Sequence, residues 1–153
     1  MIVDTGLPGN LSEIKGASEL AKELGFDGIF AAEVKFDPFV ASAVASQHAP
    51  GMDLGTKIAV AFARTPMTTA YAAHGLNELS GGRFHLGLGT QVRAHVTRRF
   101  SMPWSHPTAR MREFVVAMKD IWESWRTGEP LAFKGEFYEH SLMTEYFVPE
   151  THT

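Results

Sequence analysis

The sequence predicts an α/β fold built on a parallel sheet. Four short apolar segments alternate with segments whose apolar residues recur at helical spacing, and only a few residues connect each segment to the next. Strand and helix in strict alternation with short connections indicate right-handed βαβ units. With 153 residues, 44% of them hydrophobic, the chain is long enough to bury a core. We expect a single domain over residues 1–153.

Nearly continuous apolar character marks the four expected strands and suits parallel strands that are covered on both faces. These strands are residues 2–7, 26–32, 56–63 and 83–88. Beyond the break at Gly128-Glu129-Pro130, residues 131–139 are expected to form a strand or a hairpin turning at Lys134-Gly135-Glu136. The remaining residues, 141–153, show little periodicity and are expected to be loop.

Start and stop signals bound the four expected helices, which are residues 13–24, 38–48, 66–79 and 107–126. Ser12 is a plausible N-cap, and both Asp37-Pro38 and Thr65-Pro66 place a capping residue before proline. Glycines end the first and third helices, at Gly25 and at Gly81-Gly82. The fourth carries an apolar stripe that indicates core packing rather than a cofactor site: Met111, Val115, Met118, Trp122 and Trp125.

Composition excludes several classes of site and partner. The net charge of −3 gives no basic surplus for nucleic acid. Zero cysteines exclude disulfides, thiolate metal sites and thiol nucleophiles, and the seven histidines form no metal-binding spacing, so no metal is expected. No apolar run approaches the roughly 20 residues that cross a bilayer, and the N-terminus lacks a signal-peptide pattern. A cytoplasmic protein with no membrane partner is therefore the expectation.

The most informative run is Ser80 to Arg93, where a helix passes into a strand. At the end of this strand, Gly87, Gly89 and Thr90 let the backbone approach a ligand closely. A dinucleotide-binding fingerprint would need a third glycine where Val92 stands, and an acidic residue about twenty positions later. That alternative is weak, and a strand-end turn without any ligand also remains open.

Several short runs of the sequence carry a family resemblance. They are Ala61-Phe62-Ala63-Arg64-Thr65-Pro66, Leu79-Ser80-Gly81-Gly82-Arg83-Phe84 and Leu86-Gly87-Leu88-Gly89-Thr90-Gln91. These runs resemble the bacterial-luciferase-like flavin and deazaflavin oxidoreductases, in particular the branch that uses coenzyme F-420. The resemblance implies a TIM (β/α)8 barrel, which takes about 250 residues when complete. This chain matches its N-terminal half: about four βα units, a long helix and a short hairpin or loop, stopping before the fifth strand.

A half barrel leaves an open sheet edge, which is an aggregation liability. The expected solutions are a homodimer that covers the edge, or a missing C-terminal half.

The resemblance also implies a cofactor site where the parallel strands end, since ligands of TIM barrels lie at that face. Coenzyme F-420 is the expected cofactor, with FMN as the alternative. The residues implied to bind it are Ala61, Phe62 and Ala63 beneath the ring, Gly89, Thr90 and Gln91 along the ring and ribityl chain, and Arg93 toward the phosphate or acidic tail. Weaker candidates for a substrate or phosphate contact are His95 and Arg64.

Glu33, at the end of the second expected strand, is the implied catalytic acid or base, because a partly buried carboxylate can be tuned for proton transfer. A purely structural role for Glu33, as a cap or paired with Lys35 or Arg64, is an equal alternative. Asp37 is interpreted as a helix cap.

The expected function is hydride transfer between coenzyme F-420 and a small alcohol or carbonyl compound. The alternatives are an FMN-dependent monooxygenase and a non-catalytic flavin-binding or structural half barrel. The small molecule itself is not predicted.

Overall fold

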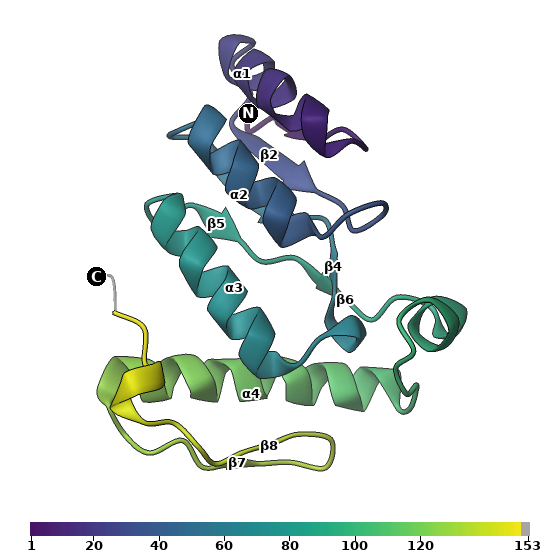
Figure 1. Cartoon of the computed structure of the whole chain (residues 1–153), viewed down its shortest axis with the longest axis vertical. Helices are drawn as coiled ribbons and strands as arrows, with labels where there is room; N and C mark the ends of the chain where they lie inside the picture. The colour runs from purple at the N-terminus through teal and green to yellow at the C-terminus, as the bar shows by residue number, and fades with distance from the viewer. Residues whose placement is uncertain (151–153) are drawn as a thin grey trace. The chain divides into compact units, whose positions relative to one another are not determined.

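The computed structural model describes residues 1–150, and within it the chain forms two compact units. The first unit contains residues 1–60 and 72–89, and the second contains residues 61–71 together with the described residues from 90 onward. Helix α3 (Pro66–Leu79) contributes to both (Figure 1). Within residues 1–150, no helix combines the length and apolarity that a membrane span requires.

The first unit is built on parallel strands, as the alternation of segments predicts. Its main sheet has the order β1-β2-β3-β5, and a second parallel pair, β4-β6, follows in the chain after β3 and β5. The strands are β1 (Asp4–Gly6), β2 (Gly28–Ala31), β3 (Asp53–Thr56), β4 (Ala59–Val60), β5 (Phe84–His85) and β6 (Leu88–Gly89). The third and fourth expected strands are therefore each divided in two.

The expected continuous strand over residues 56–63 is wrong, because β3 ends at Thr56 and β4 is limited to Ala59–Val60. The hydroxyl of Thr56 donates to the Gly87 carbonyl at 2.7 Å and accepts from the Gly87 N–H at 3.0 Å, and the same carbonyl also accepts from the Ala59 N–H at 2.8 Å. A Cβ on Gly87 would collide with the Thr56 carbonyl oxygen. Gly87 is therefore required by the approach of two backbones. Beyond β4, residues Ala61–Ala63 form a 3-10 turn, η2.

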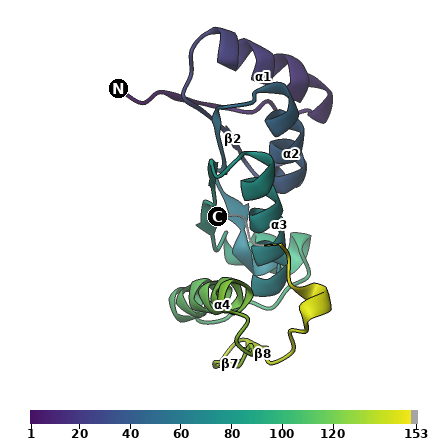
Figure 2. The ribbon, with the colours of Figure 1, turned by 90° about the vertical axis from the view of Figure 1, so that its left-hand side faces the viewer.

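Helices α1 (Ile14–Glu23) and α2 (Pro38–His48) lie together on one side of β2, as Figure 2 shows. The Asp37 side chain accepts a 2.8 Å bond from the Phe39 N–H and caps α2 as expected. The predicted Ser12 cap is wrong, because Ser12 lies inside a 3-10 turn, η1 (Leu11–Glu13), that precedes α1. Gly25 has a φ of 77°, which confirms the glycine stop of α1.

The second unit is organised on α4 (Pro107–Thr127), which ends at Gly128 in the left-handed conformation. Phe114, Met118, Ile121 and Trp125 on this helix are buried. Of the predicted stripe, burial in the core is therefore confirmed at Met118 and Trp125, whereas Met111, Val115 and Trp122 are only partly buried. The hairpin joins β7 (Phe133–Lys134) to β8 (Glu139–His140), and its turn lies later in the chain than expected. Two short turns complete the unit: η3 (His95–Arg99), which is π-helical, and η4 (Glu145–Phe147).

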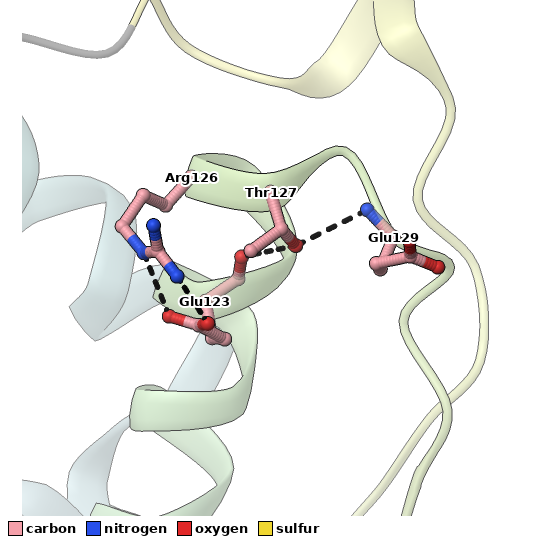
Figure 3. A network of polar contacts seen from close by, with 4 residues as sticks. All are labelled: Glu123, Arg126, Thr127 and Glu129. Atoms are coloured by element: carbon pink, nitrogen blue, oxygen red, sulfur yellow. Dashed lines mark hydrogen bonds and ion pairs between the residues drawn. The ribbon is translucent and has the colours of Figure 1, made fainter.

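A polar network closes the C-terminal end of α4 (Figure 3). The guanidinium of Arg126 binds both carboxylate oxygens of Glu123. The Thr127 hydroxyl donates to the Glu123 carbonyl at 2.8 Å and accepts from the Glu129 N–H at 3.2 Å. These bonds link the last turn of α4 to the chain that follows it at Glu129.

Candidate functional site

In the first unit, the ends of three strands bring Glu33, Val60 and Gly89 together. Glu33 follows β2, is only 9% exposed, and accepts a 2.6 Å bond from the Val60 N–H through Oε2. Val60 is also the register partner of Gly89 in the parallel pair β4-β6. A Cβ on Gly89 would approach Ile58 Cδ1 to 2.9 Å, so the close packing of the Ile58 side chain favours glycine at this position. The carboxylate is thus fixed at the strand ends by a backbone donor.

In the second unit, the η2 turn is held by aromatic packing. Phe62 is fully buried; its ring meets Trp104 edge-on at a centroid distance of 5.6 Å, and the guanidinium of Arg110 lies 4.5 Å from its centroid. The Phe62 side chain is therefore engaged in the interior of the unit. Ala61 is also fully buried and Ala63 is partly buried. Ring binding at these three residues stays a prediction.

Arg110 is a central residue of this unit that sequence reasoning missed. It is only 7% exposed and donates to the Tyr138 hydroxyl at 2.9 Å and to the Pro103 carbonyl at 2.7 Å. Burial raises the pKa of Tyr138, against the lowering effect of its bond to Arg110. A signal was present in the sequence, because Arg110 continues the buried stripe of α4 one turn before Phe114. A charged residue at a core position of a helix indicates a paired, structural role.

A groove of about 820 Å³ lies within the second unit, between the loop after β6 and the first half of α4. Its volume is in the range of small-molecule sites. The lining residues are Thr90, Gln91, Val92, Arg93, Trp104, Pro107, Thr108, Met111, Arg112, Val115 and Val116. The walls are thus mostly apolar, and two guanidinium groups are present.

Three of the predicted cofactor-binding residues, Thr90, Gln91 and Arg93, line this groove together. Gln91 adopts a φ of 62°, and its side-chain carbonyl accepts a 2.9 Å bond from the Val92 N–H. The two weaker candidates are placed differently. His95 is exposed and is not among the lining residues, and Arg64 directly follows η2, its N–H bonded to the Ala61 carbonyl at 3.0 Å.

The groove suits an aromatic ligand with an anionic tail. Met111, Val115 and Trp104 offer apolar surface on which a planar ring can pack. Arg93 and Arg112 are both exposed and can pair with phosphate or carboxylate oxygens. The residues therefore fit a flavin-type or deazaflavin-type group in chemistry.

The family model of luciferase-like monooxygenases matches residues 3–153. The chain belongs to this family. An uncharacterized protein of Mycobacterium tuberculosis is 48% identical over 148 residues, which are 97% of this chain and 44% of that protein. A coenzyme F-420-dependent glucose-6-phosphate dehydrogenase of Intrasporangium calvum is 30% identical over 145 residues, covering 84% of this chain and 42% of that enzyme.

Solved structures of luciferase-like enzymes share the fold. The oxygenating constituent of 3,6-diketocamphane monooxygenase from Pseudomonas putida, solved in complex with FMN, has a TM-score of 0.77 at 16% identity. The match covers 94% of this chain and 45% of that one. The parallel strands and helices described above thus correspond to part of a TIM barrel, and the chain spans less than half the length of these relatives.

Proposed function

We propose that the chain forms the cofactor-binding part of an oxidoreductase that transfers hydride between coenzyme F-420 and a small alcohol or carbonyl compound. The groove of the second unit carries this proposal, because it joins an apolar wall from α4 to the basic groups of Arg93 and Arg112. The dehydrogenase of Intrasporangium calvum, 30% identical, supports the choice of coenzyme F-420.

Thr90 and Gln91 would orient the ring edge through backbone and amide groups, while the Arg93 guanidinium would hold the anionic tail. Gly89 at the end of β6 in the first unit, and Ala61, Phe62 and Ala63 of η2 in the second unit, are each proposed as cofactor contacts. A bound deazaflavin supplies hydride acceptance and donation.

Glu33 is the proposed proton donor or acceptor of the reaction. It is an almost buried carboxylate at the end of β2, and Oε2 is held by the Val60 N–H. A fixed carboxylate of this kind can take the proton of an alcohol or return one to a carbonyl oxygen. His95 and Arg64 are proposed only as outer contacts to substrate or phosphate.

Titration of the purified chain with coenzyme F-420 and, separately, with FMN tests the proposal. Fluorescence quenching should saturate with coenzyme F-420. Arg93→Ala and Arg112→Ala should each weaken binding about tenfold or more, since each removes a charge-assisted partner. The matched control is Arg126→Ala, because Arg126 is paired with Glu123 and lies outside the groove. Equal affinity of all three variants would remove the groove from the proposal.

An FMN-dependent monooxygenase is the second candidate, because the family model favours it. Saturable quenching with FMN alone would support this candidate. If neither cofactor quenches fluorescence, a non-catalytic half barrel becomes the better description of this chain.

A further inference from the structure

The chain has three tryptophans, all in the second unit, and Trp104 differs from the other two. Trp122 donates its indole N–H to the Ala70 carbonyl at 3.3 Å. Trp125 is only 4% exposed, and its ring lies 4.7 Å from that of Tyr71, between centroids. Trp104 is only partly buried and lines the groove of the second unit. Trp122 and Trp125 therefore serve internal packing, whereas Trp104 borders open space.

The indole of Trp104 offers both a ring face and an N–H group to the groove. Its contact with Phe62 is edge-on, with an interplanar angle of 71°, so this contact covers at most one of the two indole faces. Among the described residues, the indole N–H has no acceptor, and its nitrogen is not a buried atom. This group of tryptophan can only donate. Trp104 thus presents an aromatic surface and one hydrogen-bond donor to a ligand.

Phe62 supports the Trp104 ring from the interior. The Phe62 side chain is fully buried and does not line the groove, and its centroid lies 5.6 Å from that of Trp104. The guanidinium of Arg110 lies 4.5 Å from the Phe62 centroid. The Phe62 ring is therefore held between an indole and a buried cation. Close packing of this kind limits the space into which the indole can turn.

Arg110 also fixes the main chain that carries Trp104. Its Nη1 donates at 2.7 Å to the carbonyl of Pro103, which belongs to the peptide group between Pro103 and Trp104. Its backbone N–H donates at 2.9 Å to the carbonyl of His106. His106 has a φ of 38°, a conformation that a residue other than glycine keeps only where its surroundings hold it. One residue thus binds the chain on both sides of Trp104.

The position of Arg110 is itself fixed by the hairpin. The Arg110 Nε donates at 2.9 Å to the hydroxyl of Tyr138, and the Tyr138 ring meets Phe114 edge-on at 5.6 Å. The planar guanidinium serves its two acceptors in a fixed fork geometry. A continuous series of contacts therefore leads from the hairpin through Arg110 and Phe62 to the groove.

We propose that Trp104 is the residue on which the planar ring of the bound ligand packs, and that Arg110 is a positioning residue that acts through Phe62 and the Pro103 carbonyl. The ligand is a fused heteroaromatic ring with an acceptor at its edge, because the indole presents a flat face and a donor. This inference rests on the proposed function of the groove and assigns the residues that fix the place of the ring. A side chain that is held in place before binding loses little freedom on binding, so its support strengthens the complex.

Titrations with coenzyme F-420 and with FMN test the role of Trp104. Trp104→Ala should weaken binding about tenfold or more, because the stacking surface is lost. Trp104→Phe keeps a ring and should stay within about threefold of the wild-type affinity. In this variant the emission of the bound cofactor should rise at saturation, since an indole in contact with a flavin-type ring quenches its emission. Trp122→Phe is the control and should change neither quantity, because Trp122 does not line the groove.

Arg110→Lys tests the positioning role while it keeps the positive charge. A lysine cannot reproduce the fork that binds Tyr138 and Pro103 together. It should weaken cofactor binding about fivefold in the wild-type background but less than about twofold in Trp104→Ala, because residues that act through one another are not additive. Circular dichroism at the titration temperature checks that each variant is folded. Tyr138→Phe, which removes only the hydroxyl, replaces Arg110→Lys in this cycle if the lysine variant does not fold.

Failure of this inference and failure of the proposed function give different results. A wild-type chain that binds a cofactor while Trp104→Ala binds it equally tightly would overturn the role of Trp104 and leave the groove as the site. Additive effects of Arg110→Lys and Trp104→Ala would overturn the positioning role of Arg110. A wild-type chain that binds neither cofactor would overturn both this inference and the proposed function.

Discussion

The backbone N–H of Val60 donates a 2.6 Å hydrogen bond to Oε2 of Glu33, which joins the end of β2 to β4. The bond gives the carboxylate a structural role that exists alongside any role in proton transfer. Substitutions of Glu33 must therefore separate stability from chemistry.

Glu33→Gln and Glu33→Ala make this separation. Glutamine keeps a carbonyl oxygen for Val60 and should cost little stability, whereas alanine leaves the buried N–H without its acceptor and should cost about 1–3 kcal/mol in urea unfolding. If Glu33 transfers the proton, Glu33→Gln should lower turnover by about 100-fold or more while cofactor affinity is kept. Near-normal turnover would leave only the structural role.

Arg110→Met should destabilise the chain by about 2–4 kcal/mol. The change removes two hydrogen bonds and a cation–π contact from the buried cluster around Phe62. Urea unfolding measures the loss. Arg112→Met, on the same helix but exposed, should stay within about 0.5 kcal/mol of wild type. Similar losses for both variants would contradict the assignment of Arg110 as the buried anchor.

Glu113 should make stability depend on pH in the acid range. Its partial burial would raise the pKa, but three backbone N–H groups, of Glu136, Phe137 and Tyr138, bind the carboxylate and hold the pKa below its ordinary value of 4.5. The folded state thus favours the charged form. This stabilisation is fully present above about pH 4.5 and is lost as the pH falls through the lowered pKa.

Urea midpoints between pH 2.5 and 7, values chosen to be roughly on either side of the carboxylate range, measure this dependence. In Glu113→Gln, the urea midpoint should fall less steeply as the pH is lowered through the acid range. Glu123→Gln is the control: Glu123 also has a lowered pKa, through its bond to Arg126, but this pair is exposed and contributes little. If the urea midpoint of Glu113→Gln falls at low pH as steeply as that of the wild type, the three N–H bonds are not the cause of the pH dependence.

Ser42→Ala should stabilise the chain by about 0.5–1.5 kcal/mol. The Ser42 hydroxyl is buried in α2 and, among the described residues, has no hydrogen-bond partner, so alanine removes a desolvation cost and improves helix propensity. Ser46→Ala in the same helix is the contrast, because its hydroxyl donates to the Ala43 carbonyl at 2.7 Å. The melting temperature should therefore rise more in Ser42→Ala than in Ser46→Ala. Equal shifts of the two melting temperatures would argue against an unsatisfied Ser42 hydroxyl.

Local signals determined where most elements begin and end. Asp37 before Pro38 caps α2, and the glycines at 25, 81 and 82 have positive φ. Such signals act within one turn of the chain and are readable from the sequence. The predicted Ser12 cap was wrong, because a short 3-10 turn precedes α1, and sequence does not distinguish that turn from the helix start.

The candidate site was predictable only in part. Thr90, Gln91 and Arg93 were recognised from the glycine-rich strand end, and they line one groove. The other wall of that groove comes from α4, which the sequence identified only as a packing helix. Apolar residues that face a core and apolar residues that face a groove have the same spacing, so the pattern cannot separate them.

By itself, the sequence determined the alternation of parallel strands and helices and the family, because both depend on periodicity and on short runs of neighbouring residues. Only the tertiary structure decided the rest: the bonds of the Thr56 hydroxyl to Gly87 where the third and fourth expected strands divide, and the burial of Arg110 between Phe62 and Tyr138. Each of these joins residues far apart in the chain, so contacts made on folding, rather than local preference, fix them.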